Sequence, residues 1–281
     1  MNQLNLLVAS LVVAVGTAQA APVPFQGSDT LAGVMTDAIN AAGMEKEIVY
    51  LGGGSGKGEL ALANEEQGIA PMSREAKPEV ADQAAKKGIK LVGHVVALDA
   101  LSIFVNGSNK IARMDLPTVK AIFECTITKW EQVAGSGKAG TITVYRRNDA
   151  SGTTDAFKHF TAIKKFGNCV TVLAETADIA EKTSKDADAI GYSGASGKRD
   201  GNRAVPLAAT AEAKAVEANV KTVRDFSYPM ARKLYVYEAV DAKTDKTKTK
   251  TKEVEEKLLQ NLLDRSFLDP IVQDHEFYTI D

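Results

Sequence analysis

The sequence predicts an α/β fold of one large domain or two of ordinary size, and three observations lead to this prediction. Three times along the chain, a short β-type run, a polar turn and a run with apolar residues at helical spacing follow one another, at 23–39, 47–63 and 143–163. Roughly 260 residues follow a predicted N-terminal leader, which is enough for one large domain or two of ordinary size. The longest apolar run, 94–106, is typical of a strand buried on both faces, and its length indicates that it passes from one domain into another.

The first twenty residues are predicted to be a secretory signal peptide. Leu4 to Val15 is mostly apolar, uncharged and too short to span a bilayer, and Ala18-Gln19-Ala20 is a small-x-small cleavage pattern. Met1 to Asn5 contains no Lys or Arg, so only the amino terminus supplies positive charge. No cysteine follows the cleavage pattern, so a lipid anchor is not indicated. We expect cleavage after Ala20 and a soluble mature chain outside the cytoplasm.

The charge and the histidines exclude several classes of partner. A formal net charge of −2 provides no general attraction to nucleic acid or to anionic membranes. We therefore expect no nucleic-acid partner, and an anionic ligand would need a local positive field. His94, His159 and His275 are scattered, and no group of residues has the spacing of metal ligands. We expect no metal and no other cofactor.

The two cysteines, Cys125 and Cys169, are predicted to form a disulfide. An oxidising compartment makes a single bridge the default, and two buried free thiols are the alternative. A bridge across this separation would stabilise the fold by roughly 3–4 kcal/mol in the chain-entropy description.

Polar turns that contain hydroxyl groups precede the first two predicted helices. Gly27-Ser28-Asp29-Thr30 leads into a helical run that starts at Leu31, and a glycine-rich loop at 52–58 surrounds Ser55. Free N–H groups and hydroxyls in such turns can bind an oxyanion, and ordinary helix caps are the alternative. The glycine-rich loop lacks the phosphate-loop pattern, because Leu51 and Gly58 occupy two of its defining places, so a nucleotide hydrolase is disfavoured.

The third turn adds a cationic side chain. Thr143 to Arg147 reads as a strand, Ser151 or Thr153 is placed to cap the next helix, and Gly152 lets the backbone approach a ligand closely. The guanidinium of Arg147, four residues before Ser151, favours an oxyanion at this helix start. A capped helix with surface arginines is the alternative.

The remaining elements follow in order. Ser73 and Arg74, after a predicted strand around 68–69, are possible further donors, although Ser73 could instead cap a helix. The Lys/Thr run 243–252 is a solvated linker or, alternatively, a docking surface for a membrane partner. The other predicted elements are a short helix at 116–123, strands at 169–173, 189–193 and 228–237, and an amphipathic helix at 253–263.

Three helix starts with Ser or Thr predict a shared site, because loops of this kind gather beyond the carboxyl ends of the strands in α/β folds. At this point the chain resembles the substrate-binding proteins of bacterial phosphate ABC transporters, which are two-lobed periplasmic binding proteins. The resemblance covers nearly all of the mature chain. Its most specific part is Arg147, three residues and then Ser151-Gly152-Thr153. The other parts are 27–30, 53–56, 73–74, 96–106, 121–123, 126–130, 189–192, 228–229 and Arg232.

The resemblance implies the type II periplasmic binding protein fold, with a mixed central sheet flanked by helices in each lobe and a ligand cleft between the lobes. It places lobe 1 at 21–103 and 225–281, and lobe 2 at 104–224. It implies a periplasmic monomer that is not an enzyme, captures inorganic phosphate and delivers it to an ABC transporter permease in the inner membrane.

The resemblance also implies a set of ligand contacts. Arg147 would supply the main charge, and Asp149 would orient it. In many relatives an acid follows the serine at the place of Ser73 and accepts the proton of phosphate, which rejects sulfate; this chain has Arg74 there, and Asp29 or Asp149 could accept the proton instead. The predicted phosphate-binding residues are Ser28, Thr30, Leu31, Ser55, Ser73, Arg74, Arg147, Ser151, Gly152 and Thr153.

Several alternatives stay open at this stage. The same fold could bind another tetrahedral oxyanion such as sulfate, or serve phosphate-dependent adhesion or signalling. A secreted hydrolase of phosphate esters is disfavoured, because no histidine pairs with a candidate serine in the sequence. Affinity and selectivity among phosphate, sulfate and arsenate are not determined by these patterns.

Overall fold

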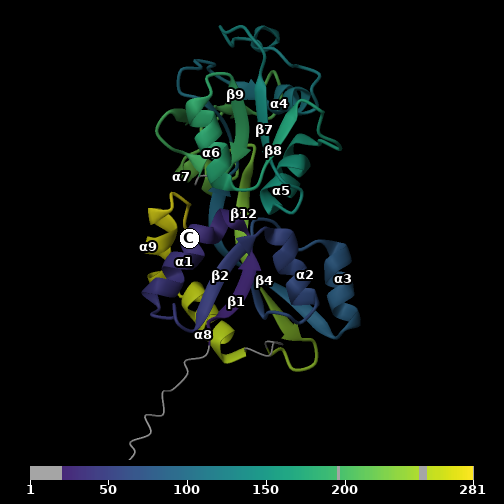
Figure 1. Ribbon diagram of the computed structural model, residues 1–281, viewed down its shortest axis with the longest axis vertical. Helices are drawn as coiled ribbons and strands as arrows, with labels where there is room; N and C mark the ends of the chain where they lie inside the picture. Colours follow the sequence, from purple (N-terminus) through teal and green to yellow (C-terminus); the bar gives the residue numbers. More distant parts are fainter. Residues whose placement is uncertain (1–20, 195–196, 247–251, 281) are drawn as a thin grey trace, which may run out of the picture.

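A computed structural model describes residues 21–194, 197–246 and 252–280, so the predicted signal peptide and part of the Lys/Thr run lie outside the described residues. The chain forms two lobes, one above the other in Figure 1, and each combines strands with flanking helices. The predicted two-lobed α/β fold is confirmed. The lobe limits predicted from the sequence stay a prediction. Within the described ranges, no helix has the length and apolar character needed to cross a bilayer.

The upper lobe in Figure 1, lobe 2, is built on one mixed sheet of five strands. β5 pairs antiparallel with β9 and with β10, and β7 pairs parallel with β8 and β9. Phe157 stacks on Tyr192 with ring centroids 3.9 Å apart in the core beneath. The strands of the sheet, in spatial order, are β10 (Asn202–Ala204), β5 (Ser102–Asn106), β9 (Ala189–Ser193), β7 (Thr143–Arg147) and β8 (Val170–Leu173).

Short elements complete lobe 2. Trp130, in the 3-10 helix η2 (Trp130–Gln132), is fully buried in the same core. The helices are α4 (Leu116–Phe123), α5 (Gly152–Thr161), α6 (Thr176–Lys185) and α7 (Val220–Arg224), and β6 (Met114–Asp115) pairs with β11 (Leu207–Ala208).

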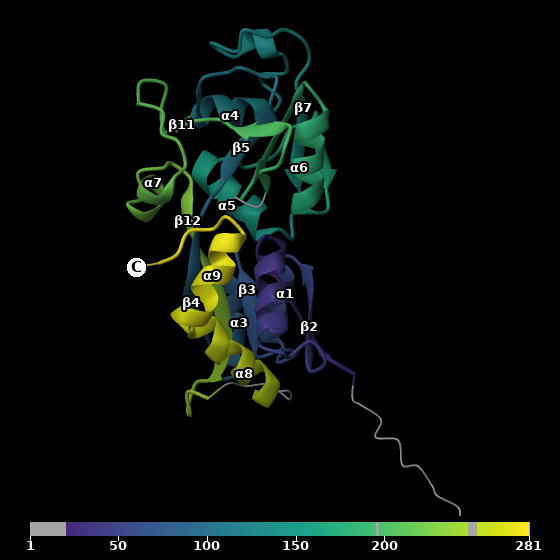
Figure 2. The same ribbon diagram turned by 90° about the vertical axis from the view of Figure 1, so that its left-hand side faces the viewer.

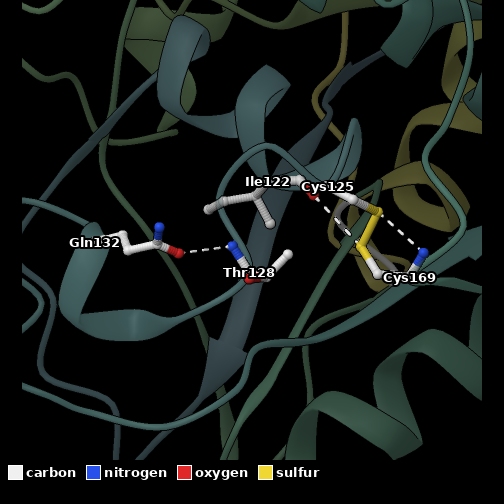
Figure 3. The surroundings of a disulfide bond; sticks show 5 residues. All are labelled: Ile122, Cys125, Thr128, Gln132 and Cys169. Atoms are coloured by element: carbon white, nitrogen blue, oxygen red, sulfur yellow. Dashed lines mark hydrogen bonds between the residues drawn. A yellow bond between two sulfur atoms is a disulfide. The ribbon is translucent and has the colours of Figure 1, made fainter.

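Cys125 and Cys169 form a disulfide in lobe 2, as predicted (Figure 3). The bridge joins the segment after α4 to the start of β8, and Cys169 N–H also donates to Cys125 Sγ at 3.0 Å. The alternative of two free thiols is therefore wrong. The bridge ties together two segments of lobe 2 and does not cross between the lobes.

Lobe 1 contains two small sheets in place of a single central one. β1 (Val23–Gly27) pairs parallel with β2 (Ile48–Gly53), while β3 (Ile69–Met72) and β4 (Ile89–Ala100) flank β12 (Ala231–Asp241) antiparallel. β1 and β3 lie side by side but in different sheets, and Pro71 in β3 has no N–H to donate. The Gln67 side chain bonds to the β1 backbone instead, accepting from Gln26 N–H at 3.0 Å and donating to Gln26 O at 2.8 Å.

Helices cover the lobe 1 sheets on both sides (Figures 1 and 2). The predicted apolar face of the first helix is buried, since Val34, Met35, Ala38 and Ile39 pack in one core with α8 and α9 residues such as Leu258. The helices are α1 (Ala32–Ala41) after the 3-10 turn η1 (Asp29–Leu31), α2 (Ser55–Ala63), α3 (Pro78–Lys86), α8 (Lys252–Leu263) and α9 (Arg265–Asp274).

The predicted long strand 94–106 passes between the lobes, but it is two strands. β4 belongs to the lobe 1 sheet and β5 to the lobe 2 sheet, with a break at Leu101, whose N–H donates to Met230 O at 3.0 Å. The return crossing leads into β12, which lies beside β4 at the junction in Figure 2. A third segment joins them, because Leu98 and Tyr278 exchange backbone hydrogen bonds. The lobes are thus linked by adjacent strands.

Candidate anion-binding site between the lobes

The three predicted turns meet where the lobes face each other. Thr30 of lobe 1 and Thr153 of lobe 2 lie with their hydroxyl oxygens 2.8 Å apart. A Cβ on Gly152 would come within 2.3 Å of Ser55 Oγ, so only glycine allows the start of α5 to approach that hydroxyl so closely. The turns follow the carboxyl ends of β1, β2 and β7, which is where ligands bind in α/β folds.

Six of the predicted hydroxyl side chains are almost completely buried. Ser55 Oγ lies 3.2 Å from Ser73 Oγ and accepts a hydrogen bond from Ser73 N–H at 3.0 Å. Ser28 Oγ has no hydrogen-bond partner among the described residues, and a buried hydroxyl without a partner costs about 1–3 kcal/mol. A ligand with acceptor oxygens would recover that cost. The six are Ser28, Thr30, Ser55, Ser73, Ser151 and Thr153.

Backbone donors add to these hydroxyls. α2 starts at Ser55 and α5 at Gly152, and neither helix has a side-chain cap on its first N–H groups. The first N–H groups of a helix have no carbonyl one turn earlier to accept them, so they favour an anion. One of them is already used, because Gly56 N–H in α2 donates to Ala150 O of lobe 2 at 3.2 Å. The predicted donor Leu31 N–H is different, since it donates to Ser28 O at 3.1 Å within the 3-10 turn.

Arg147 lies at the end of β7 and is the buried cation that the sequence predicted, but its carboxylate partner is not the predicted one. Its Nη2 donates to Asp29 Oδ2 across the lobes at 2.6 Å, and Asp29 Oδ1 accepts from Gly53 N–H at 2.7 Å. Asp149 instead pairs with Arg146 at 2.9 Å, and its side chain is 74% exposed. Successive side chains of a strand point to opposite faces, so Arg146 and Arg147 face different partners. Asp149 therefore does not orient Arg147.

The remaining bonds of Arg147 fix its guanidinium and leave part of it for a ligand. Nε donates to Ala174 O at 2.8 Å and Nη1 to Thr176 Oγ1 at 2.7 Å. A guanidinium has five N–H groups, so two have no acceptor among the described residues. Arg147 is 1% exposed, which makes those two donors part of a dry site.

Arg74, which the sequence predicted as a phosphate contact, bonds to carboxylates of both lobes. Its Nη1 and Nη2 donate to the two oxygens of Glu59 at 2.8 and 2.7 Å, and its Nε donates to Asp155 of lobe 2 at 2.8 Å. Lys77 approaches Asp155 as well, at 3.2 Å. Two carboxylates thus balance the two cations, and Glu59 holds the Arg74 guanidinium in a bidentate pair.

Two further charged residues at the site were not among the predicted contacts. Arg232 donates to Asp99 Oδ2 through Nε at 2.9 Å and Nη2 at 2.6 Å, and also to Ser73 O and Thr153 Oγ1, each at 3.2 Å. Both side chains are buried. A signal was present in the sequence, because Asp99 is a lone charge in the longest apolar run, and a buried charge requires a partner.

The electrostatic character of the site comes from dipoles rather than net charge. Arg147 is paired with Asp29 and Arg232 with Asp99. Burial, and then the Asp29 carboxylate, raise the pKa of Tyr50, so its phenol keeps the proton that it donates to Ser28 O at 2.7 Å. The arrangement offers many hydrogen-bond donors to a small anion. Its two carboxylates, Asp29 and Asp99, already accept hydrogen bonds from Arg147 and Arg232.

A cavity of about 490 Å³ adjoins the hydroxyl cluster. Ser73 and Arg232 line it from one side, and His159 and Phe160 of α5 from the other. Among the described residues, no group of His, Cys, Asp and Glu side chains is arranged to hold a metal ion. The chemistry available at this interface is recognition of an oxyanion by N–H and O–H donors.

Comparison with known proteins agrees with this description of a two-lobed binding protein. A family model described as PBP superfamily domain matches residues 13–262. The chain is 31% identical over 226 residues to the phosphate-binding protein PstS of Pseudomonas aeruginosa. The aligned region covers 75% of this chain and 70% of that protein. The chain therefore belongs to the PBP superfamily and, within it, to the family of that protein, as the resemblance predicted.

Two other relatives are informative. A protein of Clostridium perfringens, described as a phosphate ABC transporter substrate-binding protein and solved with bound phosphate, superposes with a TM-score of 0.77. It is 24% identical and covers 92% of this chain and 100% of its own, a likeness that shows the fold. A relative named alkaline phosphatase L, from Pseudomonas aeruginosa, is 29% identical over 130 residues, which is 40% of this chain and 33% of that one.

Proposed function

We propose that this protein captures inorganic phosphate between its lobes and delivers it to an ABC transporter permease. The observation that carries the proposal is the meeting of buried hydroxyls from both lobes beside Arg147, which has two N–H groups to spare among the described contacts. The names of the Pseudomonas and Clostridium relatives support phosphate as the ligand and a transporter as the partner.

Phosphate would replace contacts that the hydroxyls now make with each other. Thr30 bonds to Thr153 across the lobes, and Ser55 bonds to Ser73. A tetrahedral anion inserted there would accept from hydroxyls and helix starts of both lobes, so binding would hold the lobes together. The proposed contacts are the predicted Ser28, Thr30, Ser55, Ser73, Arg147, Ser151, Gly152 and Thr153. We leave Arg74 and Leu31 out of the proposed contacts, because Arg74 bonds to Glu59 and Asp155 and Leu31 N–H bonds to Ser28 O.

Asp29 is the proposed acceptor for a proton of the ligand. Of the two acids suggested by the sequence, Asp149 is turned to Arg146, whereas Asp29 bonds to Arg147 inside the cleft. Each carboxylate oxygen can accept two hydrogen bonds, so Asp29 can hold Arg147 and Gly53 N–H and still accept a proton from phosphate. Sulfate, which has no proton at neutral pH, would leave that capacity unused.

The cellular setting follows from the same proposal. Cleavage after Ala20 would release a periplasmic monomer, and the closed pair of lobes would form the surface that the inner-membrane permease recognises. We propose the lobe limits predicted from the sequence, with lobe 1 at 21–103 and 225–281 and lobe 2 at 104–224.

Titration calorimetry on the mature protein, refolded free of anions, would test the ligand directly. We expect tight phosphate binding, weaker arsenate binding, and little or no sulfate binding. Equal sulfate binding would keep the site and reassign the ligand, and no binding of any of these anions would contradict the proposal. A parallel assay with p-nitrophenyl phosphate addresses the likeness to alkaline phosphatase L, because turnover that disappears in a Ser55→Ala variant would indicate a hydrolase.

A further inference from the structure

A charged pair lies at the junction of the lobes, outside the set of contacts proposed for phosphate. Asp99 is the last residue but one of β4, Arg232 is the second residue of β12, and the two are direct partners in the antiparallel register. Their side chains are 0% and 6% exposed. The pair therefore sits inside the protein where the chain passes from one lobe to the other.

The guanidinium of Arg232 is held in one orientation and contacts both lobes. It donates twice to Asp99 Oδ2, once to Ser73 O in lobe 1 and once to Thr153 Oγ1 in lobe 2. These bonds use four of its five N–H groups. Because Asp99 balances its charge at 2.6 Å, Arg232 contributes direction rather than net charge to its surroundings.

The bond to Thr153 determines where the hydroxyl hydrogen of Thr153 can point. A hydroxyl has one hydrogen and accepts at its lone pairs, so the side of Thr153 Oγ1 that accepts from Arg232 cannot also donate there. The hydrogen is left to Thr30 Oγ1, 2.8 Å away, or to a ligand. Ser55 is arranged in the same way, since Ser73 N–H donates to its Oγ and leaves its hydrogen for Ser73 Oγ or a ligand.

We propose that Arg232, held by Asp99, is a positioning residue of the anion site that makes the Thr153 hydroxyl a hydrogen-bond donor to the ligand. This inference rests on the proposed phosphate binding. Thr153 is 1% exposed at the start of α5 and Arg232 belongs to lobe 1. The bond between them also ties correct orientation of the donor to closure of the lobes.

A double-mutant cycle on the mature protein tests this role. Arg232→Lys keeps a cation beside Asp99 but lacks the planar fork that reaches Asp99 and Thr153 together. We expect it to weaken phosphate binding roughly tenfold, about 1.4 kcal/mol. In a Thr153→Val background the same change should have little further effect, whereas in a Thr153→Ser background, which keeps the hydroxyl, the tenfold loss should return.

The controls separate positioning from structural support. Arg224→Lys alters another arginine that donates to a threonine, Thr279, neither of which is a proposed phosphate contact, and should leave the phosphate Kd unchanged. If Arg232→Lys fails to fold, the paired change Arg232→Gln with Asp99→Asn removes both charges together and replaces it in the cycle.

The outcomes distinguish the two proposals. Equal losses from Arg232→Lys with and without the Thr153 hydroxyl would overturn the positioning role, and so would an unchanged Kd. Wild-type protein that binds no phosphate would overturn the proposed function, and with it this inference. Strong coupling between positions 232 and 153 in phosphate Kd would support both.

Discussion

Arg147 and Arg74 lie at two depths of the same interface, and their surroundings give them different roles. Arg147 ends β7 and Arg74 follows β3, and each makes an ion pair with the opposite lobe, Arg147 with Asp29 and Arg74 with Asp155. Arg147 has one carboxylate partner and makes three guanidinium hydrogen bonds, whereas Arg74 bonds to Glu59 as well and makes four. The comparison indicates that the partners of an arginine, and not its position in the sequence alone, set how many N–H groups it keeps for an anion.

The difference also separates ligand binding from lobe closure. The inner pair of Arg147 and Asp29 borders the buried hydroxyls. The outer cluster consists of Arg74, Glu59, Lys77 and Asp155. In it, the side chains of Lys77 and Asp155 are 38% and 23% exposed. Salt screens exposed pairs more than buried ones. We therefore expect the inner arginine to set affinity for the anion and the outer one to bias the lobes toward the closed state.

Replacing the inner arginine should have the largest effect. Arg147→Ala removes the charge-assisted donors proposed for phosphate, and we expect the Kd measured by calorimetry to rise at least about a hundredfold. Arg146→Ala is a matched control on the same strand, since its side chain pairs with Asp149 and should leave the Kd within about twofold of wild type. Equal losses in the two variants would mean that Arg147 acts through the fold of β7.

Replacing Asp29, the acid that pairs with Arg147, tests selectivity. Asp29→Asn keeps the shape of the side chain but weakens the bond to Arg147 and reduces its capacity to accept a ligand proton. We expect phosphate affinity to fall about tenfold while sulfate affinity holds or rises, so that the preference for phosphate shrinks. Competition titrations at one pH measure the ratio. An unchanged ratio would show that another group accepts the proton.

Removing the outer cluster should have a smaller effect. Asp155→Asn breaks the contact of Arg74 and Lys77 with lobe 2, and we expect phosphate affinity to fall two- to fivefold, in the range of a partly exposed ion pair. The phosphate-to-sulfate ratio should not change. Small-angle scattering of the unliganded protein should show a more open average shape, and 0.5 M salt should reduce the difference from wild type. A change in the ratio would place Arg74 in the ligand site.

The sequence predicted the lobes, the helix-start hydroxyls and Arg147, because these features are local. Hydroxyls at helix starts and the turn before α5 are visible in a few consecutive residues. The ion pairs were not predictable in the same way. Asp29 and Arg147 are separated by 118 residues and Asp99 and Arg232 by 133, and only the meeting of the lobes decides which acid reaches which arginine.

The smallest expected effect concerns the acid that the sequence paired with Arg147. Asp149 lies two residues beyond Arg147, yet it bonds to Arg146 at the surface with a 74% exposed side chain, and an exposed pair of this kind contributes at most about 1 kcal/mol. Asp149→Ala should therefore leave phosphate affinity within about twofold of wild type. Calorimetry should compare the phosphate Kd of Asp149→Ala with that of Asp29→Asn. If Asp149→Ala cost more affinity than Asp29→Asn, the partner of Arg147 in solution would be Asp149, and the inner pair would have to be reassigned.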